Sequence, residues 1–201
     1  MIPDGRQRNR NPNQVLRLGW SGVHLPRKAL PILLHAVARL PDEVAVELHI
    51  LGDGPETSRW QNLATRLNIE QKCRFYGWLP RNEALDVMQS MDAFAITSLQ
   101  DACSTVLFEA LALGLPVISH ATCGFKDVLT QECGLLVSLE SPAQSVNRFA
   151  QGIEKLFRDP PLYQRLSQGA LQRAGELSWK QRASVVLEHY GQIVQQKRRA
   201  A

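Results

Sequence analysis

Two carboxylates eight positions apart, Asp101 and Glu109, flank a short polar segment near the middle of the chain. An apolar run at 93–96 precedes the segment, and apolar side chains recur after it at helical spacing, which predicts a strand, a loop and a helix. Ser104 and Thr105 stand where that helix would begin. The loop therefore offers unpaired backbone N–H groups and the positive end of a helix dipole to an anion, with two acids able to address different parts of one ligand.

A lysine near the start of the chain adds a cation to this chemistry. Lys28 follows the loop 21–26, which contains Gly22, and it is predicted to project from the start of a helix beginning at about Arg27. A lysine in that place could neutralise a diphosphate leaving group. The plainer interpretation of each feature is a solvated lysine, a solvated loop aspartate and a glutamate on a helix surface.

The cysteines do not form a recognisable metal or disulfide pattern. The four are spread along the chain without a C-x-x-C pair, which favours reduced thiols over a zinc ribbon or a disulfide scaffold: Cys73, Cys103, Cys123 and Cys133. Cys103 lies inside the proposed anion loop, where it is either a reactive thiol or a small core residue. No cluster with metal-ligand spacing is evident, so no metal is expected.

Size and charge exclude several classes of protein. The chain has 201 residues, 44% of them hydrophobic, which is enough for a substantial core. The net charge is +4 and much of the excess lies near the two ends, without a recognition helix or interleaved aromatics, so nucleic acid is not an expected partner. The apolar runs are shorter than the roughly 20 residues of a membrane span. Neither a span nor a signal peptide is visible, which predicts a cytoplasmic protein.

Hydrophobic patterning predicts the elements that must position these groups. Residues 1–14 are polar and basic and are expected to form a disordered leader or linker. From Val15 onward, short apolar runs alternate with amphipathic segments, which is typical of an α/β fold with a parallel sheet. The predicted strands are 15–20, 44–51, 73–78, 93–96, 116–121 and 133–137. In the second strand, Glu47 and His49 are expected on a solvated face.

The last part of the chain is predicted to be helical. One helix begins at Ser141-Pro142 and ends at Asp159-Pro160-Pro161, and a second runs from about 162 to 175. A third is predicted at about 179–197 with four residues facing inward: Ala183, Val186, Leu187 and Tyr190. No tandem repeat appears.

An ordered set of motifs resembles one known family. The set comprises Lys28 after Gly22, the turn Gly52-Asp53-Gly54-Pro55, the segment Phe75–Pro80, the acid pair followed by Gly114-Leu115-Pro116-Val117, and Gly134-Leu135-Leu136-Val137. In this order they resemble the donor-binding, C-terminal half of the retaining GT-B glycosyltransferases of the group 1 family. The resemblance covers Val15 to the last helix. It implies a Rossmann-like three-layer α/β/α sandwich with a mostly parallel six-stranded sheet and C-terminal helices.

The resemblance also implies roles for individual residues. Lys28 would grip the donor phosphates, Asp101 would contact the hydroxyls of the donor sugar, and Glu109 would hold the nucleotide ribose. Backbone amides at Cys103, Ser104 and Thr105 would meet the diphosphate.

Two further loops are implicated in the same way. Gly77, Trp78 and Leu79 would lie over the nucleotide base, although Trp78 could instead merely pack its loop. Gly124 and Phe125 would line the pocket of the donor sugar.

The sequence departs from the family pattern at four positions. Val23 stands where the family has an arginine, and Ala29 where it has a glycine. Asp101 replaces the usual glutamate and Ser104 the commoner glycine. Half of the usual cationic clamp is therefore missing, and Arg27 or His24 could substitute only through a geometry that the sequence does not show.

The resulting hypothesis is a metal-independent glycosyltransferase half that binds a UDP-, GDP- or other nucleotide-diphosphate sugar, of the kind used to build cell-envelope polysaccharides. The family's N-terminal Rossmann-like acceptor domain does not precede Val15, so the chain is expected to be a fragment or one half of a split protein, inactive alone. The resemblance leaves open a peripheral association of the full enzyme with the inner membrane face.

Alternatives are a non-catalytic nucleotide-sugar binding module and a nucleotide-sugar epimerase domain. A nicotinamide-dependent dehydrogenase ranks last because no G-x-G-x-x-G follows any predicted strand.

Overall fold

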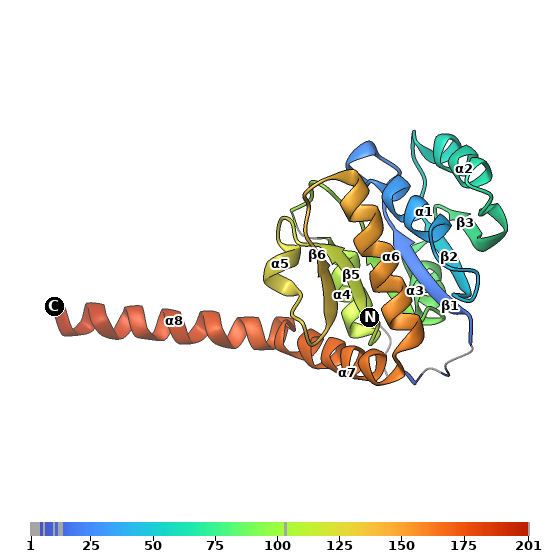
Figure 1. The fold of residues 1–201 in the computed structure, drawn as a ribbon. Helices are drawn as coiled ribbons and strands as arrows, with labels where there is room; N and C mark the ends of the chain where they lie inside the picture. The colour runs from blue at the N-terminus through green and yellow to red at the C-terminus, as the bar shows by residue number, and fades with distance from the viewer. Residues whose placement is uncertain (1–4, 6, 10, 12–13, 103, 201) are drawn as a thin grey trace.

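Six strands form one parallel sheet in the computed structural model, which describes residues 5, 7–9, 11, 14–102 and 104–200. The strands are β1 (Leu16–Ser21), β2 (Val46–Leu51), β3 (Cys73–Gly77), β4 (Ala93–Ile96), β5 (Val117–His120) and β6 (Gly134–Val137). Their order across the sheet is β3-β2-β1-β4-β5-β6, and every neighbouring pair is parallel (Figure 1). Strands this apolar are buried on both faces, as parallel sheets require.

Helices cover both faces of the sheet (Figure 1). Residues of α1 (Leu30–Ala38), α2 (Thr57–Arg66) and α6 (Pro142–Arg158) belong to one apolar cluster. Residues of α3 (Arg81–Gln89), α4 (Thr105–Ala112) and the short α5 (Phe125–Val128) belong to a second. The predicted fold class, a Rossmann-like three-layer α/β/α sandwich, is confirmed. The remaining elements are the 3₁₀ turns η1 (Pro26–Lys28) and η2 (Glu70–Lys72) and the C-terminal helices α7 (Pro160–Glu176) and α8 (Trp179–Ala200).

Helix α7 closes the edge of the sheet at which the strands begin. Tyr163 donates its hydroxyl to the carbonyl of Asp92, just before β4, at 2.8 Å. Ser167 does the same to Gly114, shortly before β5, at 2.7 Å. These bonds satisfy loop carbonyls that would otherwise be buried without a partner. The opposite edge, where the strands end, is therefore the edge left for a ligand.

The helix predicted from Arg27 is interrupted. Residues 26–28 form the 3₁₀ turn η1, Ala29 has a φ of 49°, and α1 begins only at Leu30. Left-handed backbone favours glycine because a Cβ crowds the following carbonyl, which is why a glycine would suit this position. Lys28 consequently lies on a separate turn before the helix, and the prediction that it projects from a helix start is wrong in that respect.

The second strand is less solvated than its alternating pattern suggests. Glu47 is half-buried and His49 is almost wholly buried. The His49 Nδ1 pairs with the hydroxyl of Tyr76 on the neighbouring strand β3 at 2.8 Å, and the two rings stack. A neighbouring aromatic side chain has therefore removed His49 from solvent, which one strand's pattern cannot reveal.

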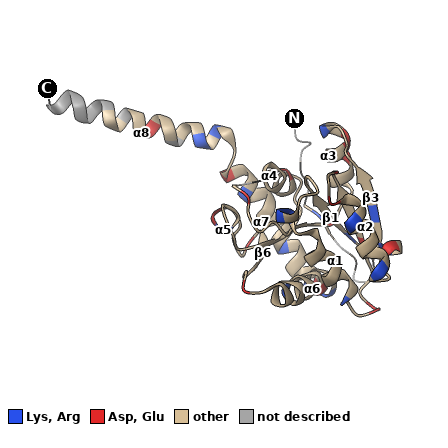
Figure 2. Ribbon diagram, turned by 90° about the horizontal axis from the view of Figure 1, so that it is seen from above, with Lys and Arg blue, Asp and Glu red and all other residues tan. Residues whose placement is uncertain are grey.

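Helix α8 is present, but its predicted inward face is wrong. It extends away from the body of the protein in both views (Figures 1 and 2). All four residues predicted to face inward are exposed: Ala183, Val186, Leu187 and Tyr190. Helical spacing of apolar residues indicates an amphipathic helix, but burial also needs a facing surface, and the described chain supplies none. No described helix is both long and apolar enough to cross a membrane.

The segment before Val15 contacts the body through Arg8. The Arg8 guanidinium donates to the carbonyls of Gln89 and Met91 at the end of α3 and of Leu113 after α4, and its backbone N–H donates to Ser167. A cation suits the carbonyl end of a helix dipole. Much of 1–14 lies outside the described residues, so a disordered leader stays a prediction.

Candidate functional site

The strand order creates a crevice at the carboxyl edge of the sheet. The chain leaves β1 toward β2 on one side, whereas β4, the other neighbour of β1, leads to β5 on the opposite side. In open parallel sheets, ligands bind outside the strand ends at such a switch point. The loops that follow β1 and β4 carry Lys28 and Asp101, so topology places both beside this crevice.

Lys28 and Asp101 form a direct ion pair. The Lys28 ammonium donates to Asp101 Oδ2, and the two side chains are only 11% and 16% exposed. The backbone of Lys28 is also held, because Thr97 at the end of β4 donates its hydroxyl to the Lys28 carbonyl at 2.7 Å. Trp20 in β1 donates its indole N–H to the same hydroxyl oxygen at 3.0 Å. A buried chain of bonds thus fixes the two loops to each other.

Arg27 supplies a second cation near Asp101. Its guanidinium donates to the carbonyl of Gln100 at 3.1 Å and lies 4.0 Å from Asp101 Oδ1. Its own carbonyl accepts from the N–H of Leu99 at 2.8 Å. Val23, where the resemblance expects an arginine, is exposed. Arg27 therefore supplies a second positive charge beside Asp101, whereas the exposed Val23 supplies none.

Glycines allow the loops of the first three strands to approach closely. Gly52 has a φ of +112°, and a Cβ there would lie 2.1 Å from the carbonyl oxygen of Gly22. Gly52 also donates its N–H to the carbonyl of Gly77 at 2.8 Å. A Cβ on Gly22 would lie 3.6 Å from the Lys28 side chain, so Gly22 borders the lysine. Gly77 has a φ of +70° and no atom near its missing Cβ, so the turn after β3 is open.

The loop after β5 lies against the loop that carries Asp101. Asp101 donates its N–H to the sulfur of Cys123 at 3.3 Å, and Gly124 donates its N–H to the carbonyl of Ala102 at 3.1 Å. Gly124 is therefore close to Asp101. The Phe125 side chain is wholly buried in the core beside α4, so only its backbone is available to a ligand.

The beginning of α4 is open in the way the anion hypothesis requires. Ser104 is the N-cap residue, but its side chain makes no capping bond, and Thr105 is exposed. The first amides of a helix have no partner within the helix. Cys103 lies outside the described residues. The start of α4 therefore presents backbone donors close to the Lys28–Asp101 pair.

Glu109 lies in the second turn of α4 and pairs with Arg81, the first residue of α3. Arg81 donates from Nε and Nη2 to one carboxylate oxygen, Oε1, at 3.2 and 2.9 Å. Both residues, with Thr105 and Phe108, line a cavity of about 710 Å³ that reaches Trp179 at the junction of α7 and α8. Glu109 thus borders an opening and is not sealed in the core.

Residues of the predicted base loop differ in their surroundings. Trp78 is 75% exposed, so packing of its own loop does not explain it. Leu79 is half-buried and packs against the cluster that contains α3 and α4. Because Arg81 follows two residues later and reaches Glu109, this loop lies next to the glutamate.

The predicted site residues thus fall into two groups. Lys28, Asp101, Gly22 and Gly124 are joined by the contacts around the β1 and β4 loops, whereas Thr105 and Glu109 share the cavity beside α3. Both groups lie toward the carboxyl edge of the sheet and are connected by the segment 101–105. Among the described residues, no hydrogen bond or ion pair joins Lys28 to Glu109. The roles predicted for these residues remain predictions.

Arg27 and Arg81 are the residues that sequence reasoning underrated. The sequence points to Arg27 only as a substitute for the cation missing at Val23, and it assigns no role to Arg81. No local pattern marks either one, because each finds its acidic partner on another loop or helix. The only available signal was that each arginine adjoins a loop predicted to meet the ligand.

Two buried histidines make hydrogen bonds that hold the loops after β1 and β4 in place. His120, at the end of β5, pairs with the Thr97 carbonyl and with the Ser145 hydroxyl, each at 3.0 Å. His24 lies against Trp60 and pairs with Thr57 through Nδ1 at 2.7 Å. Burial lowers the pKa of both histidines, so their rings are neutral supports near pH 7.

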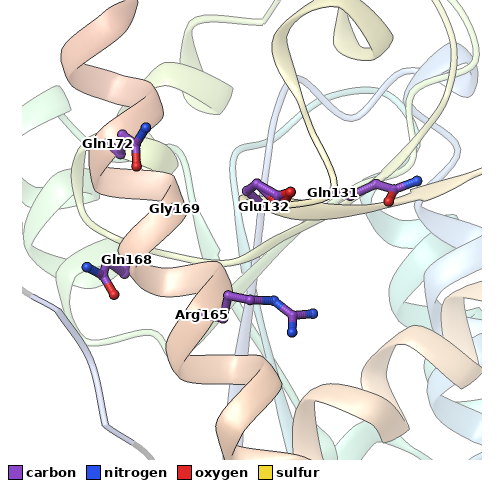
Figure 3. A pocket seen from close by; sticks show the side chains of 6 residues that line it. All are labelled: Gln131, Glu132, Arg165, Gln168, Gly169 and Gln172. Atoms are coloured by element: carbon purple, nitrogen blue, oxygen red, sulfur yellow. The ribbon is translucent and has the colours of Figure 1, made fainter.

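A second hollow lies at the other edge of the sheet. It is formed by α7 and the turn before β6, with a volume of about 450 Å³ (Figure 3). Its lining is mostly polar: Gln131, Glu132, Arg165, Gln168, Gly169 and Gln172. None of the predicted site residues lines it. Among the described residues, no group of three or more histidine, cysteine or acidic side chains is placed to hold a metal ion.

Comparison with known proteins relates this chain to glycosyltransferases. A sequence model of the family "Glycosyl transferases group 1" matches residues 2–173. The D-inositol 3-phosphate glycosyltransferase of Stackebrandtia nassauensis is 30% identical over 96% of this chain and 45% of its own length. The lipopolysaccharide core biosynthesis glycosyltransferase LpsE of Rhizobium meliloti is 32% identical over 73% of this chain and 41% of its own length.

The fold has solved counterparts. The crystal structure of Anabaena Alr3699/HepE in complex with UDP-glucose matches 82% of this chain and 45% of its own chain, with a TM-score of 0.72 and 22% identity. At that identity the likeness concerns the fold alone. The chain spans less than half the length of the curated relatives described above.

Proposed function

Because the chain belongs to the glycosyl transferases group 1 family, we propose that it is the donor-binding half of a retaining glycosyltransferase. In this proposal it binds a nucleotide-diphosphate sugar, and a second Rossmann-like domain binds the acceptor. The observation that carries the proposal is the Lys28–Asp101 pair at the switch point of the sheet, next to the open start of α4. Cations, amides and acids together suit a ligand with a diphosphate and several hydroxyls.

Each group would have a distinct task. Lys28, Arg27 and the first amides of α4 would neutralise the diphosphate as it leaves the sugar, which lowers the barrier through fixed charges and dipoles and without a metal. Asp101 would accept hydrogen bonds from the donor sugar, and Glu109 from the ribose. Departure of the diphosphate would leave an oxocarbenium-like sugar, as in glycoside hydrolysis.

The surroundings of the loops support two further assignments. The base would lie at the turn 77–79, where Gly77 is open and Trp78 is exposed. The sugar would lie near Gly124, which is bonded to the loop of Asp101. A uridine nucleotide is the first ligand to try, because the Anabaena relative in fold was crystallised with UDP-glucose.

Isothermal titration of this chain against UDP-, GDP- and ADP-sugars tests the proposal. Lys28→Ala is expected to lower the affinity for the preferred ligand by about tenfold or more, since a hydrogen bond to a charged group contributes roughly 1.5–3 kcal/mol. Glu109→Ala should lower this affinity as well. Lys155→Ala is the matched control, because Lys155 is an exposed lysine in the last turn of α6. Folded protein that binds no member of the panel would contradict the proposal.

A nucleotide-sugar binding module without transferase activity is the second candidate. The exposed Val23 favours it, because the loop that faces the site lacks a cation at that position. Sugar transfer is the measurement that separates the two. Supplying the chain with a matching acceptor domain should yield product under the first proposal, and binding without product under the second.

A further inference from the structure

The ion pair between Arg81 and Glu109 has features that stability does not explain. It joins the first residue of α3 to the second turn of α4, and the two side chains are 55% and 16% exposed. An exposed pair of this kind adds little to folding. A cation in the first turn of a helix also opposes the helix dipole. Arg81 thus occupies a position that is electrostatically unfavourable for α3. The favourable interaction it makes there is the ion pair with Glu109.

The geometry leaves half of the carboxylate available. Both Arg81 donors, Nε and Nη2, reach the same oxygen, Oε1. Within the described part of the chain, no group donates to Oε2. A carboxylate oxygen has two lone-pair sites, so Oε2 could accept from two neighbouring hydroxyl groups. The guanidinium holds one oxygen and restrains the rotation of the whole carboxylate.

The Arg81–Glu109 pair also reduces the electrostatic repulsion between Glu109 and a bound diphosphate. A nucleotide diphosphate is strongly anionic and would be repelled by two bare carboxylates. Each proposed acid has its own cation in the structure, Asp101 with Lys28 and Glu109 with Arg81. The net charge of these four side chains is zero. The open amides of α4 then act on the diphosphate without opposition from the acids.

We propose that Arg81 is a positioning residue that holds Glu109 for the two ribose hydroxyls of the nucleotide. This inference rests on the proposed nucleotide-sugar site. Arg81 follows the turn 77–80, so the pair also connects the turn proposed for the base with the acid proposed for the ribose. Recognition of the ribose then depends on a contact between α3 and α4 as well as on Glu109 itself.

The test compares UDP with 2′,3′-dideoxy-UDP, which lacks both ribose hydroxyls. Titration calorimetry on the wild-type chain should show a preference for UDP of about tenfold or more, the effect of losing hydrogen bonds to a charged acceptor. Arg81→Ala should reduce that preference to about threefold or less. The unpaired charge of Glu109 then repels both diphosphates alike, so the ratio of the two affinities isolates the effect on the ribose. Arg81→Lys should restore part of the preference, and Glu109→Gln should remove most of it.

Controls separate positioning from a general structural effect. Arg59→Ala is the matched control, because Arg59 is an exposed arginine of α2 that pairs with Glu56, the residue just before that helix, and does not line the cavity. It should keep the wild-type preference. A wild-type preference retained by folded Arg81→Ala, including the case in which both nucleotides lose affinity equally, would overturn the inference and leave the proposed function standing. Wild-type protein that binds neither nucleotide would overturn the proposed function and this inference with it.

Discussion

The Lys28–Asp101 pair should be a measurable energetic coupling between the β1 and β4 loops. We consider Lys28→Met, Asp101→Asn and the double variant. Both side chains are mostly shielded from solvent, and Arg27 lies 4.0 Å from the aspartate. Removing one partner of a fully buried pair costs about 3–5 kcal/mol, and exposed pairs are worth about 0–1 kcal/mol. This pair lies between those limits.

We expect each single variant to lose about 2–3 kcal/mol of unfolding free energy and the coupling to be about 2 kcal/mol. Arg27 reduces the loss in Lys28→Met because it remains as a partial partner for Asp101. The double variant removes both charges, so it should lose less than the sum of the two single losses. Asparagine and methionine keep most of the side-chain volume, which limits cavity effects.

Urea unfolding followed by circular dichroism measures the coupling. The matched control is the exposed pair Glu154 and Arg158 on α6, whose coupling should be only about 0.3–0.5 kcal/mol. High salt should reduce the coupling energy of the control pair more than that of the Lys28–Asp101 pair, because screening acts mainly on exposed charges. Additive losses in the Lys28 and Asp101 variants, or a coupling no larger than the control, would refute the interpretation of a shielded pair at the site.

Two further predictions concern the support of the site. Gly52→Ala should destabilise the fold by about 2 kcal/mol or more, because its φ of +112° is unfavourable for alanine and the new Cβ would meet the Gly22 carbonyl at 2.1 Å; a urea midpoint equal to wild type would contradict this. Stability should also fall on acidification, because burial lowers the pKa of His24, His49 and His120 in the fold below the usual 6.5. The unfolded chain takes up protons first as pH falls through 6.5, so each histidine can cost up to about 1.4 kcal/mol per pH unit below that value. Urea midpoints from pH 7 to 5 measure the effect, and a flat profile would rule it out.

Local sequence patterns were sufficient for the six strands and for most of the helices, although they missed the interruption before α1 and the short α5. The run 93–96 and the helical spacing after Thr105 correspond to β4 and α4, because apolar periodicity reports burial on a sheet or along a helix. The motifs were also sufficient for the family. The start of α4 was predicted at the polar pair 104–105, and the structure has Ser104 as its N-cap and Thr105 as its first residue.

Local sequence patterns could not predict contacts between segments that are distant in the chain. The stripe that contains Leu187 and Tyr190 predicted burial, but burial requires a facing surface that lies outside the helix. His49 alternates like a solvated residue, yet Tyr76 on the adjacent strand covers it. In both cases the neighbour in space decided the environment, and periodicity along one element carries no information about that neighbour.

By itself, the sequence determined the α/β units, the spacing of the two acids and the membership of the family, because these depend on residue types at short separations. The tertiary structure decided which cation meets which acid. Lys28 is 73 residues from Asp101, and Arg81 is 28 residues from Glu109. The first pair forms because parallel strands bring the loops at their carboxyl ends to one edge of the sheet, and the second because α3 and α4 belong to the same apolar cluster on one face. Their partners are therefore set by the strand order and by side-chain reach, which only the folded chain defines.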